Sequence, residues 1–167
     1  MKRRPRLTRA RLRELLHYNR KTGEFRWRKR TGARASPSAA PACRYQDARY
    51  IRIDGRAYIE HQLAWFYMTG RWGRPTIDHR DGDVNNNRWN NLRRATASQN
   101  NANRRRPRNN TSGYKGVYRS RKPERWCAQI GVNGKLKHLG TFDTPQAAHA
   151  AYVAAARKCH GEFARAE

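Results

Sequence analysis

The chain has 167 residues, enough for one ordinary domain or two small ones. Its 38 Lys and Arg against 12 Asp and Glu give a formal net charge of +26. A cation this dense favours a polyanionic partner, nucleic acid before an anionic membrane. Aromatic residues make up 10% of the chain, which excludes a wholly disordered basic tail. No apolar run approaches the roughly 20 residues of a membrane span, and the basic N-terminus lacks the apolar stretch of a secretory signal, so we expect none.

Local signals in the first half predict a compact α+β unit. Three leucines at helical spacing behind Thr8, a suitable N-cap, predict a helix over residues 8–18. The alternation of aromatic and arginine residues over 25–28 predicts a strand. Residues 31–43, which are rich in Ala, Ser, Pro and Gly, predict a loop.

Two further elements complete this unit. Asp54-Gly55 lies between the alternating segments 50–53 and 56–59, and predicts a two-residue hairpin. The apolar segment 61–68 predicts a buried helix that ends at Gly70.

A basic linker is expected next. The stretch 101–110 contains no apolar residue except Ala102, and its arginines suit a phosphate backbone. These arginines are Arg104, Arg105, Arg106 and Arg108.

The last third of the chain predicts a three-stranded antiparallel sheet with one helix packed across it. Strands are expected over residues 116–119, 126–132 and 135–142. Thr144 and Pro145 begin the helix, and Gly161 lies just past its end. The inner stripe of this helix comprises Ala147, Ala148, Ala151, Tyr152, Ala155 and Ala156.

A turn at Asn133-Gly134 sets the register of the last two strands. It pairs Gln129 with His138 and Ala128 with Leu139, so that Cys127, Gln129 and Gly131 face away from the helix. The same register puts Lys135 and Lys137 on the apolar side. Either these lysines extend past its margin or the turn is longer than two residues.

The three cysteines give no sign of a metal or disulfide site. Cys43, Cys127 and Cys159 are far apart and odd in number, and no CxxC pair occurs. We therefore expect buried or idle thiols in a reducing cytosol.

Acidic residues cluster in the segment 77–103, IDHRDGDVNNNRWNNLRRATASQNNAN. Asp78, Asp81 and Asp83 would repel a polyanion unless a cation offset their charge, and carboxylate and amide oxygens favour Mg²⁺ over Zn²⁺. A calcium EF-hand is excluded, because Asn86 and Leu92 stand where that loop needs Gly and Glu.

This segment resembles the HNH (ββα-metal) endonucleases, in the form carried by phage and intron-borne homing enzymes. Asp78-His79 follows a short strand, and Asn91 stands twelve residues after His79. Asn100 lies on a following helix that Thr96 or Ser98 would cap. The resemblance implies that Asp78 and Asn100 bind one divalent metal ion, Mg²⁺ or alternatively Mn²⁺. It also implies that His79 is the general base and that Asn91 braces the loop that orients it.

Two neighbouring residues bear on these roles. Asn100 stands where the family often has His, which disfavours a softer metal, and the adjacent Asn101 blurs the assignment. His61 precedes the apolar helix, and we expect a structural hydrogen bond from it.

The C-terminal part resembles the ethylene-response-factor (APETALA-type) DNA-binding domain over nearly all of residues 112–163. The likeness is carried by Gly116-Val117, residues 126–130, residues 139–142 and the alanine-rich helix. It implies a sheet laid in the major groove. The residues expected to read bases are Arg119, Arg121, Gln129 and His138. Gly131 and Leu136 replace arginines common in relatives, so base specificity would be weaker or different, and a sheet that grips only phosphates remains the alternative.

Together these features predict an α+β protein. We expect an HNH nuclease domain over residues 1–103 with its core motif at 61–103, a linker at 104–110 and an APETALA-like domain over 111–167. The expected function is metal-dependent hydrolysis of double-stranded DNA in a bacterial cytoplasm by a free-standing phage or mobile-element enzyme, a monomer or weak dimer. The alternative is a DNA-binding regulator with an inactive HNH unit. An RNA-binding protein is disfavoured, because no aromatic single-strand platform is evident.

Overall fold

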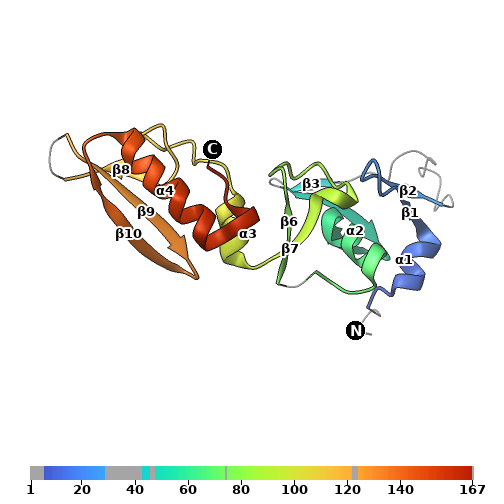
Figure 1. Cartoon of the computed structure of the whole chain (residues 1–167). Coiled ribbons are helices and arrows are strands. Elements are labelled where there is room, and N and C mark those ends of the chain that lie inside the picture. Colours follow the sequence, from blue (N-terminus) through green and yellow to red (C-terminus); the bar gives the residue numbers. More distant parts are fainter. Residues whose placement is uncertain (1–5, 29–42, 46–47, 74, 122–123, 167) are drawn as a thin grey trace, which may run out of the picture. The chain divides into compact units, whose positions relative to one another are not determined.

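The computed structural model describes residues 6–28, 43–45, 48–73, 75–121 and 124–166. Helices and small antiparallel sheets follow one another along the chain, so the protein is α+β, as expected. The chain divides into two compact units, Met1–Arg94 and Ala95–Glu167 (Figure 1). Within these described ranges, no helix is long and apolar enough to cross a membrane.

The first helix is shorter than the leucine spacing predicts. Helix α1 spans Arg9–Leu15, and the side chain of Thr8 accepts a hydrogen bond from the backbone of Arg11, which confirms Thr8 as N-cap. The chain then leaves the helix, because strand β1 (Leu16–Tyr18) pairs antiparallel with β2 (Phe25–Trp27). The predicted strand is thus confirmed, and the predicted helical end is wrong.

The Asp54-Gly55 hairpin is confirmed. Strands β3 (Cys43–Tyr45), β4 (Ala48–Ile53) and β5 (Arg56–Ile59) form one antiparallel sheet. Asp54 and Gly55 both have positive φ, at 48° and 77°, as a two-residue turn of this hand requires. Of the loop expected over residues 31–43, residues 31–42 lie outside the described residues, and Cys43 begins strand β3.

Helix α2 (Glu60–Thr69) follows β5 directly and ends at Gly70 in the left-handed conformation, as expected. Arg9 of α1 donates to the backbone oxygens of Tyr67 and Met68 at this helix end. The core of the first unit lies between α1, α2 and the strands. Its largest fully buried apolar side chains are Leu12, Leu16, Phe25, Ile51, Ile53 and Leu63.

A second, two-stranded sheet carries the acidic segment. It consists of β6 (Thr76–His79) and β7 (Leu92–Ala95), with the short helix η1 (Trp89–Asn91) before β7. Ile77 and Leu92 anchor the two strands in the core of the first unit. Both ends of the loop between β6 and β7 are therefore held by strands packed in the core.

The second unit contains the predicted three-stranded sheet. Strands β8 (Val117–Arg119), β9 (Trp126–Val132) and β10 (Lys135–Phe142) lie in the order β10-β9-β8. Helix α4 (Pro145–His160) contacts all three strands, and Figure 1 shows it lying across them. Thr144 is the N-cap of α4 and Gly161 is its C-cap. Gly161 also begins the short helix η2 (Gly161–Phe163).

The register of the sheet agrees with the prediction only up to a bulge. Gln129 faces His138, but Ala128 pairs with Gly140 instead of Leu139, because the ladder shifts between His138 and Gly140. Lys135 pairs with Val132 across a two-residue turn, so the turn is not longer, and the exposed lysines extend into solvent. On α4, Ala148, Tyr152 and Ala156 are buried, whereas Ala147 is exposed.

Helix α3 (Ala97–Asn103) belongs to the second unit, although the expected nuclease domain extends to residue 103. Thr96 caps it in a capping box with Gln99, so Thr96 and not Ser98 is the N-cap.

Helix α3 packs against α4, β9 and η2. The buried Lys115 holds its C-terminal end. Nζ of Lys115 donates to the backbone oxygens of Ala102 at 2.6 Å, Arg104 at 2.5 Å and Arg165 at 3.0 Å. Burial lowers the pKa of Lys115 to about 8.

Candidate active site

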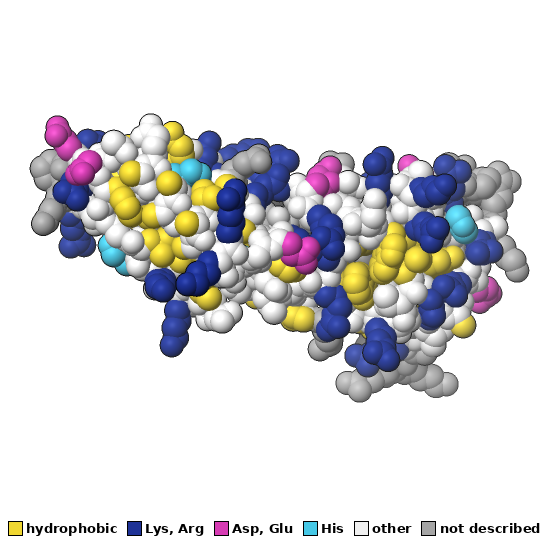
Figure 2. Space-filling model, in the orientation of Figure 1, with side chains coloured by type: hydrophobic (Ala, Val, Ile, Leu, Met, Phe, Trp, Pro, Cys, Tyr) yellow, Lys and Arg dark blue, Asp and Glu magenta, His cyan; other side chains and the backbone are white. Residues whose placement is uncertain are grey.

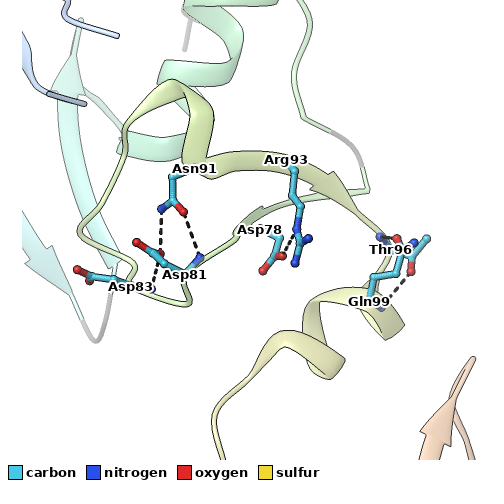
Figure 3. Close-up of polar contacts among 7 residues, drawn as sticks. All are labelled: Asp78, Asp81, Asp83, Asn91, Arg93, Thr96 and Gln99. Carbon is cyan, nitrogen blue, oxygen red and sulfur yellow. Dashed lines mark hydrogen bonds and ion pairs between the residues drawn. The ribbon is translucent and has the colours of Figure 1, made fainter. Parts of the chain in front are cut away.

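The first motif residue, Asp78, is a buried carboxylate on β6. Its Oδ2 accepts a hydrogen bond from Nε of Arg93 on β7 at 2.8 Å, and both side chains are about 5% exposed (5% and 6%) (Figure 3). A buried charge is tolerated when an opposite charge and hydrogen bonds compensate it. Arg93 thus binds the Asp78 carboxylate inside the sheet, and the sequence pattern did not single out this partner.

His79, the next residue, is 5% exposed. Its Nε2 lies 2.9 Å from Oδ1 of Asn87, which is 2% exposed. The Asn87 amide oxygen faces Nε2 and accepts a hydrogen bond from it when the imidazole proton is on that nitrogen. This contact orients the His79 ring within the interior of the first unit.

His61 at the start of α2 packs edge-on against His79. The ring centroids are 5.0 Å apart and the planes are nearly perpendicular, at 88°. Burial, followed by the charge of His79, lowers the pKa of His61 to about 4. At neutral pH His61 is uncharged, so it packs against the His79 ring without placing a positive charge beside it.

Asn91 closes the loop between β6 and β7. Its Nδ2 donates to Oδ1 of Asp81 at 2.9 Å and to the backbone oxygen of Asn86 at 2.7 Å, and its Oδ1 accepts from the backbone N–H of Asp81 at 3.1 Å. Figure 3 shows this amide bridging to Asp81. Burial acts to raise the pKa of Asp81, but hydrogen bonds from Asp83, Asn91 and Asn86 hold it below its usual value. These contacts give Asn91 a direct means of bracing the loop.

The strand pair β1–β2 supports the same loop from the other side. The hydroxyl of Tyr18 donates to the backbone oxygen of Asn87 at 2.6 Å, and Trp89 N–H donates to the oxygen of Arg20 at 3.0 Å. Gly23 lies so close that a Cβ there would sit 2.5 Å from the carbonyl carbon of Asn87. The position of Asn87 is therefore set by tertiary packing.

Asn100 lies half-buried on α3, in the second unit. Asp78, His79 and Asn91 lie together in the first unit, so the pairing of Asn100 with Asp78 stays a prediction. The donor chemistry of the two residues, a carboxylate and an amide oxygen, fits a hard divalent cation. Within the described residues, no group of three His, Cys, Asp or Glu side chains could hold a metal ion.

The residues expected to contact DNA differ in exposure. The arginines at 104, 105, 106 and 108 are all exposed, as is His138, while Gln129 opposite is half-buried. Figure 2 shows many Lys and Arg side chains and few acidic ones on the face of each unit that it presents. This surface suits a polyanion.

The register of strand β8 places Arg119 on the opposite face of the sheet from the expected one. Arg119 pairs with Trp126, while Tyr118 pairs with Cys127, so Tyr118 rather than Arg119 shares the side of Gln129. Tyr118 is 41% exposed. Cys127 on that side is covered by its neighbours, at 7% exposed.

A pocket lies at this end of the sheet. It is lined by Tyr118, Arg119, Ser120, Arg121, Arg125, Cys127 and Thr141. Arg125, which sequence reasoning did not select, pairs with Asp143 at 3.1 Å and donates to the oxygen of Thr141. Arg119 and Arg121 thus reach the same pocket, although Arg119 belongs to the other side of the sheet.

Comparison with known proteins assigns this site to a class. Residues 58–102 match the family described as HNH endonuclease, and this range contains Asp78, His79, Asn91 and Asn100. The chain belongs to the HNH endonuclease family. It is similar to Protein 3.8 of Escherichia phage T7, with 36% identity over 89 residues, which cover 53% of this chain and 73% of the phage protein.

Proposed function

We propose that this protein is a metal-dependent endonuclease that hydrolyses phosphodiester bonds of double-stranded DNA, with His79 as the general base. The observation that carries the proposal is the buried hydrogen bond between His79 Nε2 and Asn87 inside the matched family region. This contact orients the imidazole of His79, and an oriented general base is typically worth about 10²–10⁴-fold in rate.

In the proposed reaction, His79 Nδ1 accepts a proton from the attacking water. The water oxygen forms a bond to phosphorus, the bond from phosphorus to the 3′ oxygen breaks, and that oxygen leaves with a proton from solvent. The ends are a 5′-phosphate and a 3′-hydroxyl. Asn91 keeps the loop after His79 in place through its contacts with Asp81.

Asp78 and Asn100 are the proposed ligands of one divalent ion, most simply Mg²⁺ and alternatively Mn²⁺. When bound, such an ion supplies positive charge to the phosphate and the leaving oxygen. Arg93 orients the Asp78 carboxylate for this role from β7.

The C-terminal unit is proposed to direct the enzyme to DNA as an APETALA-like module, residues 111–167. The arginines at 104, 105, 106 and 108 would contact phosphates, and Gln129, His138 and Arg121 would lie toward bases. The pairing of the half-buried Gln129 with the exposed His138 on adjacent strands supports this arrangement. We place its action in the cytoplasm of a bacterial host, since the relative is a phage protein.

The test is plasmid cleavage in Mg²⁺ and in Mn²⁺, followed by mapping of the ends. We expect nicked or linear product from the wild type and none from His79→Ala, with DNA binding retained by both proteins. Cleavage by His79→Ala at the wild-type rate would overturn the role of His79. No cleavage by the wild type in any divalent ion would favour a DNA-binding regulator with an inactive nuclease unit.

A further inference from the structure

A pocket of about 650 Å³ opens in the first unit, away from the residues assigned to catalysis. Its volume falls in the range of about 300–1,000 Å³ in which proteins bind small ligands. Its walls come from three parts of the chain: the segment before α1, strand β5 with the first turn of α2, and the segment between α2 and β6. The proposed catalysis uses none of the side chains that line it.

Two of the lining residues, Tyr58 and Trp72, belong to a stack of aromatic rings. The planes of these two rings are nearly parallel, at 13°, and their centroids are 5.8 Å apart. Phe66 lies parallel to Trp72, at 6° and 4.3 Å. Phe66 is buried, whereas Tyr58 and Trp72 are half-buried and reach the pocket. A flat ring that enters the pocket can therefore extend the stack.

The core holds this stack in place. Tyr58 pairs with Ile51 of β4, so its side chain lies on the same face of the sheet as the buried Ile51. Gly73 follows Trp72 and is itself buried, and a Cβ there would collide with the side chain of Ile77, which is 3% exposed. The ring surface is therefore formed before any ligand binds, which lowers the entropic cost of binding.

The rest of the lining is polar and basic. Arg6 and Arg56 are exposed, Gln62 on α2 is half-buried, and none of the described lining residues is acidic. An adjoining pocket of about 310 Å³ shares both arginines and contains Asp54, whose two carboxylate oxygens accept hydrogen bonds from Arg11 at 3.1 and 3.2 Å. Positive charge beside aromatic surface is the combination with which proteins bind the phosphates and bases of an unpaired strand.

We propose that this pocket binds one unpaired nucleotide of a DNA strand, with its base stacked on the ring surface of Tyr58 and Trp72 and its phosphates near Arg6 and Arg56. Gln62 offers its amide to the edge of the base, and the hydrogen-bonding groups of this amide match those of adenine. The choice of DNA as the ligand rests on the proposed function.

The pocket and the catalytic residues share two elements. Gln62 follows His61 on α2, and Pro75 directly precedes β6, which carries Asp78 and His79. Pro75 and Asp78 are three residues apart, which spans about 10 Å in a strand and about three nucleotide steps of DNA. A nucleotide in the pocket would therefore lie within a few nucleotides of the bond that is cut.

The test compares two DNA duplexes that differ in one base. Each has one extra residue in one strand, an adenine nucleotide in the first duplex and an abasic nucleotide in the second, so their charges are equal. The wild type should bind the adenine duplex at least about fivefold more tightly, at a salt concentration that weakens phosphate contacts. When 2-aminopurine replaces the extra adenine, its fluorescence should fall on binding, because stacking quenches it.

The variant Tyr58→Leu removes the ring but keeps apolar bulk over Ile51. It should reduce the preference for the adenine duplex to less than about twofold, because the stacking contribution is lost. Tyr50→Leu is the matched control, since Tyr50 is also half-buried but lies on the opposite face of the same sheet. This control should keep the wild-type preference.

The variant Ala57→Glu tests the pocket without changing the stack. Ala57 is exposed and lines the pocket, so a larger side chain should fill the space at little cost in stability and remove the preference. Ala10→Glu adds the same charge at an exposed position of α1 and should keep the preference. Thermal unfolding verifies that each variant is folded. If Tyr58→Leu does not fold, Ala57→Glu carries the comparison.

Binding and cleavage are measured separately. Equal binding of the two duplexes by the wild type would overturn the nucleotide site, as would a preference that survives in both Tyr58→Leu and Ala57→Glu. A wild type that cuts no DNA in any divalent ion but keeps the preference would support the pocket and refute the proposed function. A wild type that cuts DNA but shows no preference would refute the pocket alone.

Discussion

Arg93 donates from Nε to Oδ2 of Asp78 over 2.8 Å, across the two strands that frame the nuclease loop. Both side chains are buried. Because this contact joins the first motif residue to the neighbouring strand in the interior, the pair links the stability of the sheet to the chemistry proposed for Asp78.

The first prediction concerns this pair. Arg93→Met should destabilise the protein by about 3–5 kcal/mol, because it leaves a carboxylate buried without its cation. Arg94→Met changes an exposed arginine on the same strand and should cost less than about 1 kcal/mol. Urea unfolding gives the free energy of unfolding of both variants. An equal loss in the two would show that the Asp78–Arg93 pair adds nothing to the stability of the protein.

A second prediction concerns the buried lysine that holds α3. Lys115→Met removes the donor that binds the carbonyl oxygens of Ala102, Arg104 and Arg165, with a loss of about 1–3 kcal/mol for each oxygen that finds no other partner. We expect the amide protons of α3 to exchange at least about tenfold faster, as the loss of 1.4 kcal/mol would produce. Lys137→Met, on the exposed part of β10, is the control. Unchanged exchange in α3 would mean that Lys115 is dispensable for this helix.

The third prediction follows from the pKa of about 4 for His61, which lies below the usual value of 6.5. Between pH 6.5 and pH 4 the unfolded chain binds a proton at His61 that the folded chain does not bind. The free energy of unfolding that burial of the neutral ring supports above pH 6.5 is therefore lost as the pH falls toward 4. Relative to His61→Phe, the wild type should lose up to about 3 kcal/mol over this interval. Unfolding curves at several pH values give the measurement, with His17→Phe, at an exposed position, as control. Parallel pH profiles of the wild type and His61→Phe would contradict it.

The fourth prediction separates base contacts from phosphate contacts. Gln129→Ala and His138→Ala should change the preferred DNA sequence, because these side chains are proposed to read bases. Arg105→Gln should weaken binding to all sequences alike and reduce the slope of log K against log salt by about 1. Binding to a random DNA library at two salt concentrations measures both effects, and Gln146→Ala on α4 is the control. An unchanged sequence preference in the first two variants would restrict the sheet to phosphate contacts.

The sequence determined the elements whose signals are local. Thr8 and Thr144 as helix caps, Asp54-Gly55 as a hairpin turn and Gly70 as a helix end are confirmed, because each depends on the backbone preference of one or two residues. The motif spacing of Asp78 and His79 likewise selected the family that the match over residues 58–102 shows. The motif roles of Asn91 and Asn100 remain predictions.

Tertiary structure decided what local patterns leave open. Leu16–Tyr18 continues the leucine spacing of a helix, yet it forms a strand because Phe25–Trp27 is there to pair with it. The bulge beyond His138 shifts the partner of Ala128 by one residue. Arg93 and Asn87 carry no signal in the sequence, because an arginine among 38 basic residues or an asparagine in an asparagine-rich loop is ordinary until folding removes water from it. Burial then makes each polar contact obligatory, and only the folded chain determines which groups satisfy it.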